Sequence, residues 1–463
     1  MSTTNDIQGA QDTIAAIATA PGEAGIAILR VSGPGAFHIA DRVFAGTRKP
    51  SEAPANTVLY GQLVAAETGA PIDEVILLTF RAPRSYTRED VIEIQGHGGR
   101  VTVRRMLRAV LACGARLAEP GEFTRRAFLN GRIDLVQCEA VADLIRAQSD
   151  RAAAAALEQL NGVTSHSIEC IYNDLIDLDA DIEATMDFVE DELPPGINAA
   201  LHERLNACRA SVKTLLDTWE EGHLLREGAT VVISGEPNVG KSTLMNRLLG
   251  RARSIVTDIP GTTRDTIEEQ LVIGGAPIRL VDTAGLREAD CAVEREGIRR
   301  AESAMQAADV NLYVLDGSRP LAQAEAGRLA ALRGARSLVV INKADLGVKL
   351  VPGDIPAGLP QVTISLLDEG AAAVVRGVIG EVLHLHPDAP PHAAISERHR
   401  MALAEVLTEL DQADAMMGRA DIDGNLLVAE HLRVALALLG EITGREYSEE
   451  LLDSIFSRFC IGK

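Results

Sequence analysis

The chain has 463 residues, enough for about three domains that each bury a core of their own. Its composition, 46% hydrophobic and 24% charged, is that of an ordinary globular protein. The formal net charge of -21 argues against non-specific nucleic-acid binding, because attraction to phosphates dominates that kind of binding. Any action on nucleic acid therefore requires a local basic site or a partner that supplies positive charge.

Targeting signals are missing from the sequence. The first residues, MSTTNDIQGAQD, lack the basic start and apolar run of a signal peptide, and no apolar run reaches the ~18 residues that span a bilayer. The six cysteines form no close pair, which argues against a CxxC zinc site and a disulfide framework and fits a reducing compartment. We therefore expect a cytoplasmic protein without a membrane segment.

Residues 12 to 125 have the pattern of an α+β region. The runs TIAAIATAP, GIAILRVSG, VILLTFRAP and DVIEIQGHGG predict strands, and VTVRRMLRAVLACGARL predicts an amphipathic helix. Long Ala-rich segments of helical period follow, from LVQCEAVADLIRAQSDRAAAAALEQLNG onwards, broken at Pro194, Pro195 and Gly196. The acidic run from Asp174 to Glu192 is interpreted as a solvated helix face, with a metal cage as the alternative.

From about residue 229 to 384, short apolar strands alternate with helices, as a parallel α/β sheet requires. Beyond it, ERHRMALAEVLTELDQADAMM and LLVAEHLRVALALLGEITG are helical again. The simplest account is an α/β domain inserted into a helical domain, which is tolerated because domain termini often lie close together. We therefore predict a multidomain α/β protein with parts at residues 1–126, 127–226, 227–384 and 385–463, the second and fourth forming one helical domain.

The segment ATVVISGEPNVGKSTLMNRLLG contains the full GxxxxGKS pattern between a predicted strand and a predicted helix. Glycine lets the backbone N–H groups of Gly235 to Gly240 curl around phosphate oxygens, and the following helix adds its positive end. Lys241 supplies charge at the outer phosphates, and Ser242 supplies a hydroxyl for Mg²⁺. The pattern predicts a nucleotide triphosphate site.

Further motifs follow in the order that GTPases use. DIPGTTRD offers Thr263 as a switch residue that reaches Mg²⁺, and IRLVDTAG places Asp282 behind the metal and Gly285 at the γ-phosphate. In LVVINKAD, the Asp345 carboxylate can accept hydrogen bonds from N1–H and the amine of guanine, which selects GTP over ATP. The predicted GTP-binding residues are Asn238, Val239, Gly240, Lys241, Ser242, Thr243, Thr257, Asp258, Ile259, Pro260, Gly261, Thr262, Thr263, Asp282, Thr283, Ala284, Gly285, Asn342, Lys343, Ala344, Asp345, Ser365, Leu366 and Leu367.

Two positions depart from the common GTPase pattern. VTISLLDEG has Ser365 and Leu366 where Ser-Ala is usual, so the loop on the guanine side is present but altered. After DTAG stands Leu286, where many small GTPases have the Gln that orients the attacking water. Downstream carboxylates, Glu288, Glu294 and Glu296, are candidates for that task, although any one of them alone is more often a surface residue. A slow binding switch that hydrolyses little GTP unaided is the alternative.

The chain ends in FCIGK, with Cys460 close to the last residue. The simplest interpretation is a disordered tail with an incidental thiol. A prenylation box is a second interpretation, but Lys463 is not a usual last residue of such a box. The preceding amphipathic segment ELLDSIFSR favours a docked tail, in which the thiol could take part in chemistry.

These features together resemble the MnmE (TrmE) family of tRNA-modifying GTPases. The resemblance rests on DTAGLRE, the terminal CIGK, GIAILRVSG, QGHGG and PGEFTRRAFLNGRIDL, and it covers nearly the whole chain. It implies a folate-binding N-terminal domain that forms a homodimer, a helical domain in two segments, and an inserted P-loop GTPase domain with a Ras-like parallel sheet.

The resemblance also implies an activity. The family works with the flavoprotein MnmG, which carries FAD, in a heterotetramer. The pair adds an aminomethyl or carboxymethylaminomethyl group to carbon 5 of the wobble uridine in tRNA. The carbon comes from a tetrahydrofolate derivative, in the 5-formyl or methylene form.

Residue by residue, the resemblance implies several sites. Cationic side chains suit the glutamate tail of folate, and a carboxylate suits the donor edge of the pterin. The folate residues implied are Arg30, Glu93, Arg132 and Lys463. The K⁺ ligands implied are Asn238, Thr257, Ile259 and Thr262, beside Mg²⁺ held by Ser242 and Thr263. The catalytic residues implied are Glu294, which orients water, and Cys460.

A second function class stays open, a regulatory GTPase switch of the ribosome-assembly type without chemistry of its own. The GTPase motifs fit both classes. The folate residues and the terminal CIGK favour the enzyme, since a pure switch needs neither.

Overall fold

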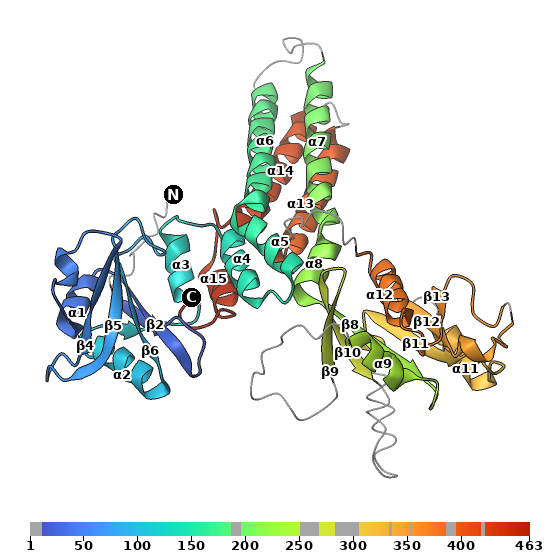
Figure 1. The fold of residues 1–463 in the computed structure, drawn as a ribbon. Helices are drawn as coiled ribbons and strands as arrows, with labels where there is room; N and C mark the ends of the chain where they lie inside the picture. The colour runs from blue at the N-terminus through green and yellow to red at the C-terminus, as the bar shows by residue number, and fades with distance from the viewer. Residues whose placement is uncertain are drawn as a thin grey trace. The chain divides into compact units, whose positions relative to one another are not determined.

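The computed structural model describes residues 12–186, 196–250, 268–282, 305–332, 336–351, 353–385, 395–417 and 422–463. The chain divides into two compact units, coloured along the chain in Figure 1. The first comprises Met1–Ala142, Leu160–Leu205 and Thr408–Lys463, and the second comprises Asp143–Gln159 and Asn206–Leu407. Among the described residues, no helix combines the length and the apolar character that crossing a bilayer requires.

The first unit begins with a seven-stranded sheet in the order β3-β4-β5-β6-β2-β1-β7. Inward side chains such as Leu29, Val31 and Leu77 pack with α1 and α2 into one core. The predicted strands and the helix α2 are confirmed, but the helix ends at Leu111 and the last two residues of the predicted segment form β7. The elements β3, β4, β7 and α1 were not predicted. The elements are β1 (Ile14–Ile17), β2 (Ala24–Ser32), α1 (Ala36–Val43), β3 (Phe44–Gly46), β4 (Thr57–Val64), β5 (Pro71–Phe80), β6 (Val91–Gly98), α2 (Arg100–Leu111) and β7 (Arg116–Leu117).

Helices follow the sheet, and the long Ala-rich run is divided into two of them. The break lies at Ser149. Its hydroxyl accepts a hydrogen bond from the Ala152 amide, 3.1 Å away, and so caps the start of the second helix. The helix α6 buries Ile171, Leu175 and Leu178 at helical spacing beside α14. The helices are α3 (Glu122–Leu129), α4 (Leu135–Arg146), α5 (Asp150–Leu160), α6 (Val163–Met186), α7 (Ile197–Asp217), α8 (Trp219–Glu227), α13 (Glu397–Met417), α14 (Ile422–Thr443) and α15 (Glu449–Phe456).

The second unit contains a six-stranded sheet in the order β13-β12-β11-β8-β10-β9. Its strands are parallel except β9, which runs antiparallel to β10. The predicted Ras-like parallel sheet is confirmed, with one antiparallel strand at its edge, where Gly274 and Gly275, both with positive φ, make a tight hairpin between β9 and β10. The elements are β8 (Ala229–Gly235), α9 (Lys241–Leu249), β9 (Glu268–Ile273), β10 (Ala276–Asp282), β11 (Val310–Asp316), α11 (Gln323–Ala331), β12 (Ser337–Asn342), β13 (Gln361–Thr363) and α12 (Ala371–Val382).

Candidate functional site

The loop between β8 and α9 has a shape that two glycines make possible. Gly235 has φ of +143°, and a Cβ there would lie 2.4 Å from the carbonyl oxygen of Val314. Gly240 has φ of +107°, and a Cβ there would lie 2.4 Å from Nδ2 of Asn342. Any larger residue at either position would displace the loop from the strand ends that it packs against. The loop backbone and the first turn of α9 can therefore form the phosphate cradle that the motif predicts.

Lys241 and Ser242 begin α9 at the end of this loop. Nζ of Lys241, a nearly buried residue, donates to the Glu236 carbonyl oxygen at 2.8 Å, so the ammonium group spans the loop. Oγ of Ser242 lies 3.4 Å from Oδ2 of Asp282, at the end of β10. A hydroxyl and a carboxylate oxygen that converge here are the donor types that Mg²⁺ prefers.

Asn342 joins the phosphate side of this site to the guanine side. Its Nδ2 donates to the Val239 carbonyl oxygen at 2.8 Å, and its Oδ1 accepts from the Leu366 amide at 3.1 Å. The altered guanine-side loop is therefore held through its backbone. The Leu366 side chain is buried in the core of the second unit, and Ser365 Oγ accepts from the Leu367 amide at 3.3 Å.

The remainder of the NKAD motif turns sharply after β12. Lys343 has a left-handed backbone, with φ of 65°, and its Nζ lies 2.6 Å from Oδ2 of Asp316 at the end of β11. Burial alone would raise the pKa of Asp316, but hydrogen bonds from Lys343 and Ser318 outweigh burial and lower that pKa. Asp345 is exposed in the short helix η3 (Ala344–Leu346), where a base can reach its carboxylate.

Many predicted residues of this site lie outside the described part of the chain. Asn238, with φ of 63°, and Thr243 are described, and both are exposed in the cradle. Of the four K⁺ ligands that the family resemblance implies, only Asn238 is described. The predicted residues outside the described ranges are Thr257, Asp258, Ile259, Pro260, Gly261, Thr262, Thr263, Thr283, Ala284, Gly285 and Glu294.

The predicted folate residues Arg30 and Glu93 face each other on β2 and β6. Nε and Nη2 of Arg30 lie 2.9 and 2.8 Å from Oε1 of Glu93, and both side chains are largely buried. The guanidinium carbon of Arg30 also lies 5.3 Å from the ring centre of Tyr86. The guanidinium carbon of Arg132 lies 4.7 Å from the same ring centre, and its Nη1 donates to the Tyr86 carbonyl oxygen at 2.7 Å. The structure thus brings two of the four predicted folate residues, Arg30 and Arg132, over one aromatic ring, and a third, Glu93, is paired with Arg30.

The C-terminal tail is docked on the N-terminal sheet. Ile461 forms an antiparallel bridge with Pro120, and the Phe459 side chain is buried in a cluster with α3, α4 and α15. Gly462 has φ of +96°, and a Cβ there would lie 2.4 Å from the carbonyl oxygen of Ile17 in β1. The disordered-tail interpretation is therefore wrong. The Cys460 thiol is free and exposed at this site.

The docked tail also lies near the Arg30 strand. Ile17, which Gly462 contacts, pairs with Leu29, the neighbour of Arg30 along β2. Lys463 follows directly, with its backbone amide 3.3 Å from the Cys460 carbonyl oxygen. The topology therefore delivers the fourth predicted folate residue to the same end of the sheet.

Two supporting residues escaped the sequence analysis. Asp316 ends an apolar strand, as Asp282 and Asn342 do, and that strand-end position was a usable signal. Tyr86 carries no comparable signal, because its neighbours Arg30 and Arg132 come from distant parts of the sequence.

Known proteins match almost the whole length of this chain. A family model described as MnmE helical domain matches residues 135–460, and one described as GTP-binding protein TrmE N-terminus matches residues 13–132. The tRNA modification GTPase MnmE of Geobacter sulfurreducens is 46% identical over 98% of this chain and 99% of its own length. The proteins of the same name from Syntrophotalea carbinolica and Bacillus subtilis are 45% and 41% identical, over 98% of this chain and 99% and 100% of theirs. The chain therefore belongs to the MnmE family of tRNA modification GTPases.

Proposed function

We propose that this chain hydrolyses GTP to drive modification of the wobble uridine in tRNA, with K⁺ as activator and MnmG as flavoprotein partner. The observation that carries the proposal is the coexistence of two separate sites in one chain. One is the nucleotide cradle joined by Asn342, and the other is the Arg30 cluster, which lies on the sheet against which the tail with Cys460 is docked. A pure switch would need only the first.

In the nucleotide site, this chain supplies charge and backbone donors. Lys241 and the first turn of α9 bind the outer phosphates, and Ser242 with Thr263 holds Mg²⁺, a Lewis acid that neutralises charge on the phosphate oxygens. Asp345 selects guanine. Leu286 cannot orient water, so Glu294 takes that role in the proposal. The K⁺ ligands are Asn238, Thr257, Ile259 and Thr262.

In the second site, Arg30, Arg132 and Lys463 bind the carboxylates of a 5-formyl or methylene tetrahydrofolate. Glu93 accepts from Arg30, so that guanidinium group is oriented before a ligand arrives. The folate provides the one-carbon unit. Cys460, exposed on the docked tail, provides a thiol next to it.

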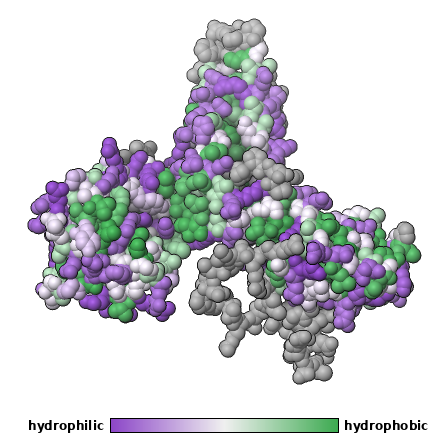
Figure 2. Space-filling view, viewed as in Figure 1, coloured by the Kyte–Doolittle hydropathy of each residue, from purple (hydrophilic) through white to green (hydrophobic). Residues whose placement is uncertain are grey.

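The proposed partners are inferred from the exposed apolar residues and the net charge of this chain. Val58, Tyr60 and Ile76 are exposed on neighbouring strands of the N-terminal sheet, and Figure 2 shows apolar patches within a largely hydrophilic surface there. Such a face supports the proposed homodimer. The net charge of -21 supports a tRNA complex in which MnmG, bound as a heterotetramer with its FAD, supplies much of the positive charge.

The finer domain boundaries, residues 1–126, 127–226, 227–384 and 385–463, belong to the same proposal. So does a cytoplasmic location, where tRNA and reduced thiols occur together.

The test is mass spectrometry of wobble uridine in tRNA from a strain that lacks this gene. The strain should lose the modified base and regain it with the wild-type gene, but not with a Lys241→Ala gene. A full complement of modified base without the gene would overturn the proposal in favour of the regulatory switch.

A further inference from the structure

We propose that Tyr86 is the positioning residue that holds Arg30 and Arg132 side by side as one anion-binding pair. The inference rests on the proposed folate role of the two arginines. Both guanidinium groups lie over the same ring, 5.3 and 4.7 Å from its centre, and the Tyr86 carbonyl oxygen accepts from Arg132 as well.

The Tyr86 ring offsets the repulsion between the two arginine side chains. Two guanidinium groups repel each other, and the negative face of an aromatic ring attracts both. Glu93 neutralises Arg30, whereas among the described residues no carboxylate pairs with Arg132. The cluster therefore has one uncompensated positive charge, which suits an anionic ligand.

The Tyr86 ring is held in place by contacts of its own. The hydroxyl of Tyr86 lies 2.9 Å from Oγ1 of Thr124 on α3, and its side chain packs against a buried cluster that includes Ile14 and Phe123. Burial raises the pKa of the Tyr86 phenol, so the hydroxyl stays protonated and keeps this hydrogen bond at neutral pH. Phe123 also meets Arg30, with 5.6 Å from its ring centre to the guanidinium carbon.

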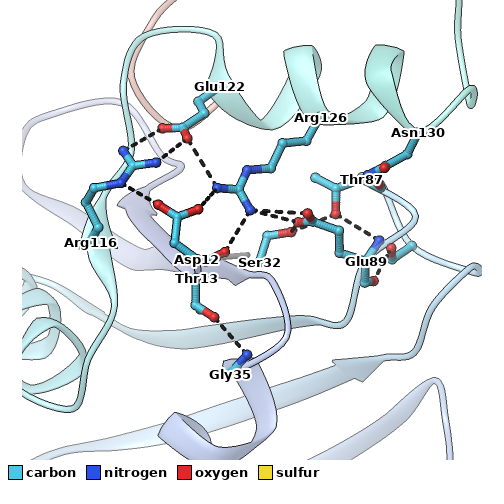
Figure 3. Close-up of polar contacts among 11 residues, drawn as sticks. Asp12, Thr13, Ser32, Gly35, Thr87, Glu89, Arg116, Glu122, Arg126 and Asn130 are labelled. Carbon is cyan, nitrogen blue, oxygen red and sulfur yellow. Dashed lines mark hydrogen bonds and ion pairs between the residues drawn. The ribbon is translucent and has the colours of Figure 1, made fainter. Parts of the chain in front are cut away.

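The loop that carries Tyr86 is anchored by the network of Figure 3. Arg126 of α3, almost fully buried, donates to Glu89 at 3.1 Å, and the Ser32 hydroxyl donates to the same carboxylate at 2.6 Å. Asn130, at the end of α3, donates to the Thr87 carbonyl oxygen at 2.7 Å. The residues directly after Tyr86 are thus held by α3 and β2, which fixes the backbone that carries the ring.

The test measures binding of 5-formyltetrahydrofolate to the full-length chain by calorimetry. Tyr86→Leu should weaken binding at least about tenfold, because the arginines lose their common ring, and Tyr86→Phe should stay within about twofold. Tyr172→Leu is the matched control, since Tyr172 carries Arg445 over its ring at 4.4 Å in the same unit, and it should leave binding unchanged.

A positioning role differs from a structural one in its ligand dependence. Loss of the ring should cost more affinity for 5-formyltetrahydrofolate than for its pteroate analogue, which lacks the glutamate carboxylates. Equal losses for both would overturn the inference, as would wild-type affinity in Tyr86→Leu. If Tyr86→Leu unfolds at a lower temperature than the wild type, trifluorophenylalanine at position 86 replaces it. That residue keeps the shape of Tyr86→Phe but removes the negative ring face. Affinity equal to that of Tyr86→Phe would then overturn the inference. No binding by the wild-type chain would overturn the folate proposal itself.

Discussion

The two candidate sites are assembled in different ways. In the second unit, the cradle, Asp282, Asp316 and Asn342 all lie at the carboxyl ends of neighbouring strands, so a parallel sheet aligns short motifs without further help. In the first unit, Arg30, Glu93, Arg132 and the tail come from separate strands and loops. That site depends on tertiary packing around Tyr86 and α3. The nucleotide site should therefore tolerate substitutions in other parts of its unit, whereas the Arg30 site should be weakened by them.

The largest expected effect separates the two sites by function. Cys460→Ser should abolish tRNA modification in a reconstituted reaction while GTP hydrolysis stays near the wild-type rate, because the exposed thiol lies on the docked tail and not in the cradle. Both rates are measured on the same preparation. Parallel loss of both would mean that the tail acts on the nucleotide site, which would remove the basis of the comparison.

A second prediction concerns the buried Arg126 network that anchors the loop of Tyr86. Arg126→Gln removes the partner of Glu89, Glu122 and Asp12, and it should lower the free energy of unfolding of the first unit by about 3 to 5 kcal/mol. Urea denaturation measures this loss. GTP affinity should not change, because none of these residues belongs to the second unit.

The neighbouring arginine provides the control. Arg125 pairs with Glu449 and Asp453 in partly exposed bridges, so Arg125→Gln should cost less than about 1 kcal/mol. A similar loss in both variants would show that the buried network contributes nothing beyond surface pairing.

The contrast also explains what the sequence could predict. The strands TIAAIATAP and VILLTFRAP and the nucleotide motifs were predictable, because hydrophobic period and glycine spacing are local properties. The strand β4 was not, since TVLYGQLV places the apolar side chains of Val58 and Tyr60 on the exposed face, so its hydrophobic pattern does not mark a buried side. The antiparallel edge strand β9 did carry a local signal that the sequence analysis left unused, the Gly274–Gly275 turn that joins it to β10. The shared ring of Tyr86 depends on packing between residues distant in the sequence, which no local pattern records.

A third prediction tests how far the nucleotide site depends on one strand-end pair. Asp316→Asn removes the charge that orients Lys343, and GDP affinity should fall about tenfold, equivalent to about 1.4 kcal/mol. Fluorescent GDP titrations measure it. Lys343→Met should weaken binding similarly, and the double variant should be no worse than either alone. Strictly additive losses would show that the two side chains act independently.

The smallest expected effect concerns the motif QGHGG, which carries family resemblance but lies outside both sites. Nδ1 of His97 lies 2.8 Å from Oδ1 of Asp73, and the His97 amide donates to Oδ2 of the same carboxylate at 2.7 Å. The hydrogen bond to Asp73 raises the pKa of His97. Burial would raise the pKa of Asp73, but the bonds from His97 outweigh it and lower that pKa.

The signs of these shifts define a pH window for His97→Asn. A raised histidine pKa stabilises the fold below the unfolded value of about 6.5, and this contribution is lost as pH rises through the folded value. A lowered aspartate pKa stabilises above its unfolded value of about 3.9 and is lost as pH falls through the folded value. The urea midpoint of the wild type should therefore exceed that of His97→Asn most between about pH 4 and 6.5, and the difference should vanish in alkaline buffer.

Because His97 is exposed, the difference in urea midpoint should be small and screened by salt. A difference that does not change with pH would show that QGHGG acts through packing alone. A change in GTP hydrolysis would mean that this part of the first unit is coupled to the nucleotide site after all.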